Sequence, residues 1–426
     1  MVGRKRITRC GEAKEEGEER RLKRLFLIAA VFWSSTLQAM EPGQQFFYLP
    51  HDLAKPFATK SVGNPPKIIR RKANWLPKVP SGFQANLFAS GLDHARWLAV
   101  APSGEVFLSE ARFNRVTLLI DRDKDGRADE KHTFAQNHNT PHGLAIHKGY
   151  LYVADLDRIW RYRWRPGQIR ALGAAEPFTK LGSLGSANGH WTRNIVFDPT
   201  GKSLYAAIGS RGNIGIEPPP RATIKEFDME SRVGVIFASG LRNPVGIAFH
   251  PDSGILYATV NERDGLGDEL VPDYFTSVKR GGFYGWPYSY IGSIPQPGLA
   301  KRRPDLVKRA IVPDVLLQSH SAPMAILFAK GGLFPEDWQD DAFVAFRGSW
   351  NAAFPRGYKI VRILFDNGKP TGGYENFVTG FRVDKSGGSG PALVWGRPVG
   401  LAMLPDGSML IAVDAAQEIW RISRIK

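Results

Sequence analysis

The chain is 426 residues long and contains 45 glycines, 30 prolines and one cysteine, Cys10. A single cysteine excludes disulfides within the chain, zinc sites built from several cysteines, and covalent c-type haem. The formal net charge of +16 favours an anionic small ligand, an anionic surface or nucleic acid as a partner. Nucleic acid is the weakest of the three and we expect no such partner, because no recognition helix and, beyond the basic N-terminus, no Arg/Lys run is identifiable.

Residues 1–39 have the order of a secretory signal peptide. A basic segment ends at residues 20–24, an apolar run follows at residues 25–33, and Ala39 is a suitable cleavage position. A retained N-terminal membrane anchor is the alternative, although the apolar run is short for a membrane span. We therefore expect a periplasmic or secreted protein, with membrane anchoring through the N-terminus as the other reading.

Residues 40–80 are rich in proline and lysine and are expected to be extended over the surface. After them the chain repeats itself. The phrase Phe-Ala-Ser-Gly-Leu occurs at residues 88–92 and again at 237–241, and each copy precedes an apolar strand and a glycine turn. Following this unit along the chain gives six copies, at residues 97–100, 143–146, 194–197, 246–249, 325–328 and 400–403.

Short apolar strands at regular spacing, joined by turns rich in glycine, predict an all-β, six-bladed propeller over residues 81–426. The last copy has three predicted strands, at residues 399–404, 409–413 and 418–422, before the chain stops at Lys426. Its fourth strand must come from elsewhere. We expect residues 84–90 to supply it and so to close the ring without an open edge.

In a propeller, the loop before each first strand and the loop after each second strand open on one face of the ring. The residues at these positions are largely polar or charged: Arg96, His142, His190, Arg193, Arg211, Arg242, Asn243, Arg347, Arg397 and Asp414. Arginines gathered at one opening suit an anionic ligand with several carboxylates, because guanidinium and carboxylate pair through two hydrogen bonds. The alternative is that these arginines brace neighbouring loops through ion pairs.

Two acidic stretches have the composition of calcium sites. Residues 121–129 place the carboxylates of Asp121, Asp123, Asp125 and Asp129 at positions 1, 3, 5 and 9 of a loop with glycine at position 6. This is the first part of a calcium loop, although no flanking helices are evident and a solvated turn is the other interpretation. The second stretch contains Asp268 and Glu269, on the face where the arginines gather.

Five phrases together resemble the quinoprotein sugar dehydrogenases, the six-bladed group that includes soluble glucose dehydrogenase and aldose sugar dehydrogenase. They are Gly-Leu-Arg-Asn-Pro at 240–244, Asn-Glu-Arg-Asp-Gly-Leu-Gly-Asp-Glu-Leu at 261–270, Gly-Gly-Phe-Tyr-Gly-Trp-Pro at 281–287, Gly-Ser-Trp-Asn at 348–351 and Gly-Arg-Pro-Val at 396–399. The chain looks most similar to the L-sorbosone dehydrogenase-like branch. The resemblance extends from residue 81 to the end of the chain.

The resemblance implies pyrroloquinoline quinone (PQQ), a tricarboxylate, and a calcium ion bound beside it. His190 takes the place of the catalytic base, and Arg397 or Arg211 would stabilise negative charge on the reduced cofactor. The implied cofactor contacts are Arg242, Asn243, Arg397, His142 and Arg347. Asp268 and Glu269 correspond to the acidic calcium motif.

Two positions depart from the family pattern. Arg347 stands where histidine is expected before Gly-Ser-Trp-Asn, and Gly189 stands where the glucose enzymes have aspartate before the base. Both departures affect the expected identity of the substrate more than that of the cofactor.

The implied activity is oxidation of an aldose or a sorbosone-like sugar aldehyde, with electrons leaving to a separate acceptor such as a cytochrome or a quinone pool. A homodimer is compatible with this reading. Two alternatives remain open at the level of the residues. One is a calcium-dependent lactonase or esterase on the same fold, and the other is a non-catalytic propeller that binds glycans, since fold alone does not decide function.

Overall fold

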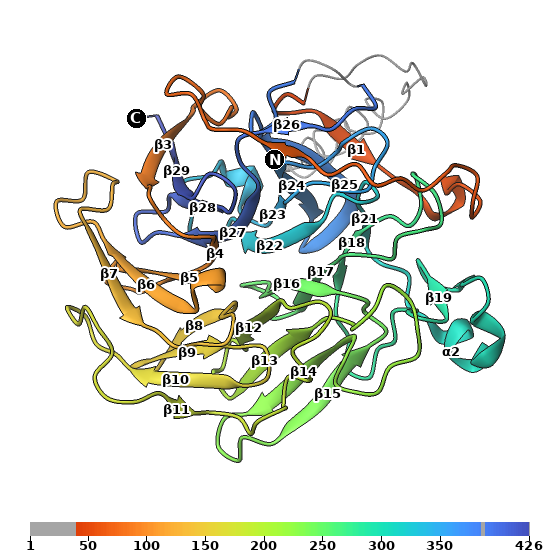
Figure 1. Ribbon diagram of the computed structural model, residues 1–426, viewed down its shortest axis with the longest axis horizontal. Coiled ribbons are helices and arrows are strands. Elements are labelled where there is room, and N and C mark those ends of the chain that lie inside the picture. Colours follow the sequence, from red (N-terminus) through yellow and green to blue (C-terminus); the bar gives the residue numbers. More distant parts are fainter. Residues whose placement is uncertain (1–39, 385–387, 426) are drawn as a thin grey trace, which may run out of the picture. The chain divides into compact units, whose positions relative to one another are not determined.

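The computed structural model describes residues 40–384 and 388–425 (Figure 1). The predicted signal peptide or anchor, residues 1–39, lies outside the described residues. Within the described part of the chain, no helix has the length and apolar character needed to cross a bilayer.

Antiparallel sheets stand around a central axis as the six blades of a propeller (Figure 1). Blade 1 contains β4 (Ala95–Val100), β5 (Val106–Glu110), β6 (Arg115–Ile120) and β7 (Glu130–Ala135). Blade 2 contains β8 (Leu144–His147), β9 (Tyr150–Ala154), β10 (Ile159–Arg163) and β11 (Glu176–Pro177). Blade 3 contains β12 (Arg193–Phe197), β13 (Ser203–Ile208), β14 (Thr223–Asp228) and β15 (Gly234–Ser239).

The remaining blades follow in chain order. Blade 4 contains β16 (Pro244–Phe249), β17 (Leu256–Val260), β18 (Tyr274–Ser277) and β21 (Val315–Leu316). Blade 5 contains β22 (Pro323–Phe328), β23 (Ala342–Phe346), β24 (Lys359–Asp366), β25 (Lys369–Val378) and β1 (Gln45–Phe47). Blade 6 contains β27 (Pro398–Met403), β28 (Met409–Val413), β29 (Glu418–Arg424) and β3 (Phe83–Ala89). The predicted all-β, six-bladed propeller is confirmed, and its six repeat units correspond to the first strands of the blades.

Little regular structure lies outside the blades in the described residues. Between β18 and β21 the chain forms β19 (Ser289–Tyr290), β20 (Ile294–Pro295) and the short helix α2 (Pro304–Arg309). Short 3₁₀ turns occur at Pro50–Asp52, Ala111–Phe113, Ala300–Arg302 and Glu336–Trp338.

The second strand of a blade packs against other blades on both of its faces. Every residue of β5, β17, β23 and β28 is buried. This explains why these strands are mostly apolar and do not alternate between apolar and polar residues. Burying one such Val, Leu, Ile or Phe side chain contributes about 1.5–3 kcal/mol, so these strands supply much of the core.

The first strands crowd together at the axis, and this explains the glycines of the repeat. A Cβ atom at Gly246 would lie 2.1 Å from the carbonyl oxygen of Met324 in blade 5. A Cβ atom at Gly400 would lie 2.3 Å from the carbonyl oxygen of Arg96 in blade 1. Only glycine permits the backbones of neighbouring blades to approach so closely.

The ring is closed by strand β3, as the sequence predicts. β3 pairs antiparallel with β29, with Leu87 opposite Trp420 and Ala85 opposite Ile422. Phe88 of β3 is only 2% exposed and joins the largest apolar cluster of the molecule. The pairing covers the outer edge of blade 6 and so removes an open strand edge.

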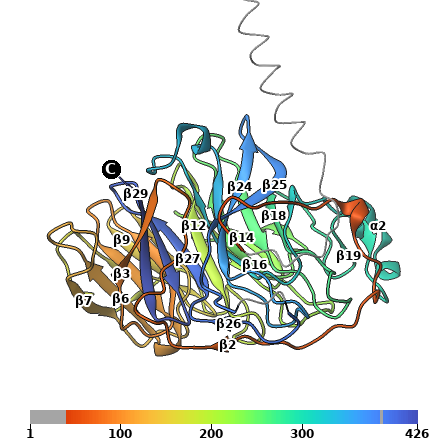
Figure 2. The same ribbon diagram turned by 90° about the horizontal axis from the view of Figure 1, so that it is seen from above.

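The extended segment before β3 also takes part in the sheets, which the sequence does not reveal. β1 adds a fifth strand to blade 5, with Gln45 opposite Glu375. β2 (Lys67–Ile68) pairs in parallel with β26 (Leu393–Val394), and Figure 2 shows the two together at one face of the propeller.

Phe88→Ala should lower the free energy of unfolding by about 3–5 kcal/mol, the usual cost of truncating a buried phenylalanine. Gln84→Ala is the matched control, because Gln84 lies on the same strand but is exposed, and it should change stability by less than about 0.5 kcal/mol. Denaturant titration of both variants measures the difference. Equal stability of the two variants would show that β3 does not seal the ring.

Candidate functional site

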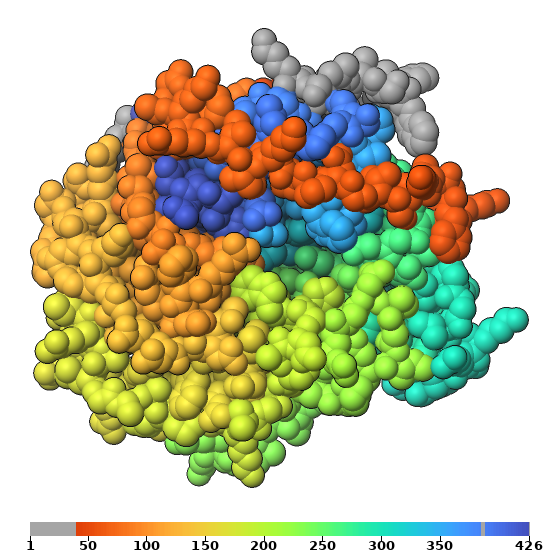
Figure 3. Space-filling view, viewed as in Figure 1, coloured from red at the N-terminus to blue at the C-terminus, as the bar shows by residue number. Residues whose placement is uncertain are grey.

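The loops before the first strands and after the second strands emerge on one face of the ring. Figure 3 shows the molecule hollowed at the centre of the ring. The N-terminal segment borders the same loops, since the backbone N–H of Asp268 donates to Thr59 Oγ1 at 2.7 Å and that of Asn64 donates to the Trp350 carbonyl at 2.7 Å. The candidate site is therefore built from several blades and from the segment before β3.

Asp414, directly after β28, is the centre of the charged cluster near the axis. It accepts hydrogen bonds from Arg96 of blade 1 at 2.8 Å, Arg347 of blade 5 at 2.7 Å and Arg397 of blade 6 at 3.1 Å. The side chains of Asp414 and Arg96 are buried, whereas those of Arg347 and Arg397 remain 26% and 20% exposed. Three blades thus meet at one carboxylate.

Three guanidinium groups around one carboxylate leave a surplus of two positive charges. Burial alone would raise the pKa of Asp414, but the charges of Arg347, Arg397 and Arg96 hold it well below its usual range. Burial lowers the pKa of Arg96 to about 9, which leaves it charged at neutral pH. The surplus on the partly exposed Arg347 and Arg397 favours an anion at this place.

His190 lies in the loop before β12, and its Nδ1 is 2.9 Å from the carbonyl oxygen of Ser210 and 3.0 Å from Ser210 Oγ. Because a carbonyl oxygen only accepts, we place the proton on Nδ1, so that the lone pair is on Nε2. Nε2 has no hydrogen-bond partner among the described residues. Burial, together with the charge of Arg242, lowers the pKa of His190 to about 4, and the imidazole is neutral at pH 7.

Arg242, directly before β16, is held by the loops around it. Its guanidinium donates to the Asn213 carbonyl, to Asn213 Oδ1 and to the Asn261 carbonyl at 3.0–3.1 Å, and it lies 3.5 Å from Asp264. Arg242 is therefore a brace as well as a charge. The adjacent Asn243 is buried, and its Oδ1 has no partner among the described residues.

His142 is more deeply buried than its predicted role as a cofactor contact requires. Its ring lies 4.7 Å from that of Trp97 and 5.5 Å from that of Trp191, and the residue has no exposed surface. Burial lowers its pKa well below the usual value, so the imidazole is neutral. The half-buried residue at this place is Trp191, over which Arg96 stacks at 4.8 Å. Arg211, the alternative to Arg397 for stabilising the reduced cofactor, follows Ser210 in the loop after β13, and its side chain is exposed.

The carboxylates of the predicted acidic calcium motif are engaged by an arginine. Arg356 donates to Asp268 Oδ2 at 2.8 Å and to both carboxylate oxygens of Glu269 at 2.8 and 2.9 Å. No sequence motif distinguishes Arg356. Its only signal is its position in the loop after β23, the second strand of blade 5, because loops at that place in a blade open on the axis.

Two further polar residues lie at the site: Asn351, from the Gly-Ser-Trp-Asn phrase, and His320, which the sequence does not distinguish. His320 Nδ1 lies 3.5 Å from Asp264 Oδ1, and Asn351 Nδ2 donates to the same oxygen at 2.6 Å. His320 lies three residues before β22, the first strand of blade 5. The sequence signal for it is this position, because loops before first strands open on the axis.

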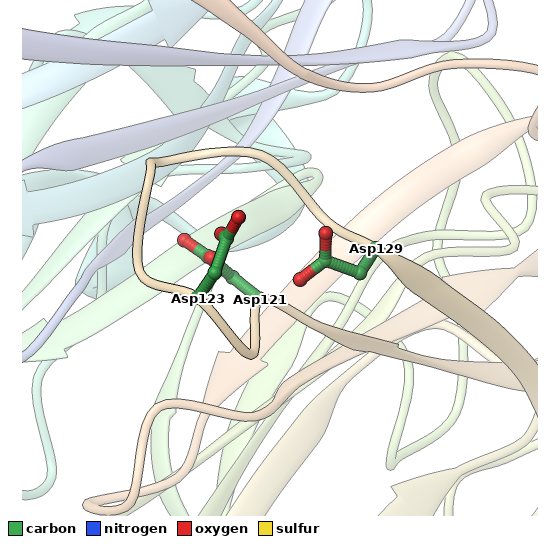
Figure 4. A group of neighbouring side chains, drawn as sticks. All are labelled: Asp121, Asp123 and Asp129. Carbon is green, nitrogen blue, oxygen red and sulfur yellow. The ribbon is translucent and has the colours of Figure 1, made fainter.

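The acidic loop 121–129 joins β6 to β7, on the opposite face of the ring. Carboxylate oxygens of Asp121, Asp123 and Asp129 lie within 4.8 Å of one another (Figure 4). Asp125 is not part of this group, and its carboxylate accepts the backbone N–H of Arg127 at 2.7 Å. Asp121 Oδ1 is buried without a partner among the described residues.

The fold and the site together define a six-bladed propeller with an arginine-rich cluster near its axis. The TrAA12-like family model matches residues 77–272 and 306–425, more than half of the chain, and the chain belongs to this family. The Glucose / Sorbosone dehydrogenase model matches residues 225–349. The resemblance to the quinoprotein sugar dehydrogenases is thereby confirmed.

Individual relatives are distant. The chain is 28% identical over 359 residues to an uncharacterized protein of Borreliella burgdorferi, covering 81% of this chain and 90% of that one. It is 24% identical over 409 residues to the pyrroloquinoline quinone-dependent pyranose dehydrogenase of Coprinopsis cinerea, covering 82% of this chain and 54%, about half, of that protein. A calcium structure of the AA12 carbohydrate-active enzyme of Trichoderma reesei superposes with a TM-score of 0.70 at 18% identity, covering 84% and 99% of the two chains.

Asp414→Asn should destabilise the fold by about 3–5 kcal/mol, because it leaves buried guanidinium groups without their carboxylate. Asp406→Asn is the control, since Asp406 pairs with one arginine, Arg421, and is 49% exposed, so that its loss should cost about 0–1 kcal/mol. Denaturant unfolding of both variants, with and without an added polycarboxylate, measures the effect. Equal costs for the two would show that Asp414 does not hold the cluster together.

Proposed function

We propose that this protein is an oxidoreductase that oxidises an aldose or a sorbosone-like sugar aldehyde, with PQQ as cofactor and His190 as base. The observation that carries the proposal is the surplus of positive charge around Asp414, on the face that also holds the neutral imidazole of His190, whose Nε2 has no hydrogen-bond partner among the described residues. The Coprinopsis relative, a PQQ-dependent pyranose dehydrogenase, supports it.

The residues on this face fit a tricarboxylate. Arg347 and Arg397 each have guanidinium surface left after pairing with Asp414, and Arg96 Nε is buried without a partner among the described residues. Arg242 adds a fourth positive charge, although loop oxygens occupy most of its donors. Arg347 and Arg397 are therefore the strongest carboxylate contacts in the proposal. When bound, PQQ supplies the two-electron acceptor for the oxidation.

His190 is suited to take a proton from a sugar hydroxyl. The bond from Nδ1 to the Ser210 carbonyl fixes the ring orientation and leaves Nε2 as the basic atom. With a pKa of about 4 the imidazole is unprotonated at neutral pH but is a weak base. Anionic carboxylates bound to the nearby arginines would offset the charge of Arg242 and raise this pKa toward the working range. Binding of the cofactor and activation of the base are coupled in this way.

We propose calcium as a second component of the loaded site, and the calcium structure of the Trichoderma relative supports this. The predicted ligands Asp268 and Glu269 are hydrogen-bonded to Arg356, which an ion at those carboxylates would have to displace. Asn243 Oδ1 and Glu262 Oε1 are buried oxygens without a partner in the described structure, and calcium takes such oxygens as ligands. The Asp121, Asp123 and Asp129 group is a second, separate candidate for calcium, with a structural role.

The electrons would leave to a separate acceptor, because the single cysteine excludes covalent c-type haem on this chain. On the strength of the predicted signal peptide we propose that the reaction takes place in the periplasm or outside the cell.

Arg397→Ala and Arg347→Ala should each weaken PQQ binding about tenfold or more, since a hydrogen bond to a charged group contributes about 1.5–3 kcal/mol. Arg161→Ala is the matched control, because Arg161 is paired with Glu176 and is 18% exposed but lies on blade 2 away from the axis. Titration of cofactor-free protein with PQQ, with calcium and with a chelator, gives the affinities. Unchanged affinity in both axis variants would leave the arginines as loop braces and favour a binding module or a lactonase.

His190→Gln should lower turnover by about 10²–10⁴-fold with little change in PQQ affinity, the usual loss when a positioned general base is removed. In the intact protein, turnover should fall as the pH drops through the pKa of His190, which is about 4 in the cofactor-free state and higher once the anionic cofactor is bound. His132→Gln, on the opposite face and 30% exposed, is the control. Retained turnover in His190→Gln would assign the base to another residue.

A further inference from the structure

A cavity of about 610 Å³ lies between blades 1 and 2, away from the axis. Its walls come from residues 133–138, which include the end of the outermost strand β7, from Trp160 and Tyr162 of β10, and from residues 171 and 173–175. Figure 1 shows blades 1 and 2 side by side in the ring. The volume falls within the range of about 300–1,000 Å³ that is typical of small-molecule sites.

The alternation of β10 gives this cavity an aromatic wall without charge. Trp160 and Tyr162 lie on the side that faces blade 1, where the ring of Tyr162 is 6.0 Å from that of Phe134. Arg161 and Arg163 lie on the other side, over the ring of Tyr150 at 4.4 and 5.5 Å. The cavity therefore presents aromatic surface although β10 is rich in arginine.

The aromatic wall is held by a buried polar chain. His138 Nδ1 lies 2.9 Å from Asp155 Oδ1, and its Nε2 lies 3.0 Å from the hydroxyl of Tyr162. Trp160 Nε1 donates to the other oxygen of Asp155 at 3.0 Å. One carboxylate thus orients both wall residues, and Arg158 stacks on the Trp160 ring at 4.8 Å. Rings fixed in this manner lose little conformational freedom when a ligand binds.

The rest of the lining consists of small and uncharged groups. Thr133, Gln136 and Asn137 are exposed and carry hydroxyl and amide groups that donate and accept hydrogen bonds. Residues 171 and 173–175 contribute alanine and glycine, and the Ala171 N–H donates to the Phe134 carbonyl at 2.8 Å, which joins this segment to β7. His138 is the one ionisable side chain of the lining besides Tyr162, and both of its ring nitrogens are engaged.

We propose that the cavity between blades 1 and 2 binds one or two sugar units of a neutral carbohydrate. Pyranose rings combine an apolar C–H face with a rim of hydroxyls, and they match a fixed aromatic wall surrounded by uncharged hydrogen-bonding groups. No carboxylate, guanidinium or ammonium group belongs to this lining, and the neighbouring charges, Asp155 and Arg158, are engaged with the wall residues themselves. The site is separate from the axis, so it would attach a longer glycan to the protein without occupying the candidate active site.

Isothermal titration of cofactor-free protein with neutral oligosaccharides, namely cello-, xylo-, manno- and chito-oligosaccharides, tests the proposal. At least one series should bind, and Trp160→Ala should weaken that binding tenfold or more. Ala174→Trp provides a second variant, since Ala174 is exposed and an indole there would fill the cavity without removing any wall residue. Trp75→Ala is the matched control, because Trp75 is also half-buried and stacked by a cation, Lys72, at 5.1 Å.

Binding that is lost in both cavity variants and kept in Trp75→Ala would support the proposal. Binding that survives in Ala174→Trp would assign the sugar to another surface and overturn it. Absence of binding across all four series would overturn it as well. None of these results depends on PQQ or on turnover, so failure here and failure of the proposed oxidoreductase activity are distinguishable.

Discussion

The candidate site depends on the ion cluster around Asp414. This buried carboxylate holds Arg96, Arg347 and Arg397, which come from blades 1, 5 and 6, and it sits at the seam where the ring closes. The same seam is sealed on its outer side by the pairing of β3 with β29. Assembly of the charged cluster therefore requires closure of the ring, because Arg96 reaches Asp414 only when blade 1 packs against blade 6.

Such a cluster costs stability, and that cost indicates function. Burial disfavours each charge, and the arginines outnumber the carboxylate three to one. A fold selected for stability alone would balance the charges or replace them with apolar side chains. In the proposed function an anionic ligand would restore the balance of charge. The same ligand would also raise the pKa of His190, which burial and Arg242 lower.

The parts of the structure that local patterns determine were predictable from the sequence. The repeated glycine follows from crowding at the axis, as at Gly246, and the strand that closes the ring follows from the missing fourth strand of blade 6. The positions of charged residues on one face follow from the blade order. The ion-pair partners of these residues cannot be predicted in this way, because they lie far apart in the sequence. Asp268 and Arg356 are separated by 88 residues, and Arg96 and Asp414 by 318. Nor does any pattern distinguish the buried His142 from the half-buried His190.

The segment before β3 contributes to the candidate site although it does not belong to the repeat. The loop at residues 264–270 does not pair with a strand, and residues of the N-terminal segment form hydrogen bonds with its backbone groups instead. Phe57 N–H donates to the Leu266 carbonyl at 2.7 Å, and Thr59 and Ser61 hydroxyls accept from the backbone of Asp268 and Gly267. Unpaired backbone groups in a loop of this kind would otherwise need water. The N-terminal segment therefore holds residues 266–268 of this loop, whereas Asn213 holds the backbone of Asp264 beside Arg242 through two hydrogen bonds of 2.9 Å. The candidate site thus includes the extended segment as a structural component.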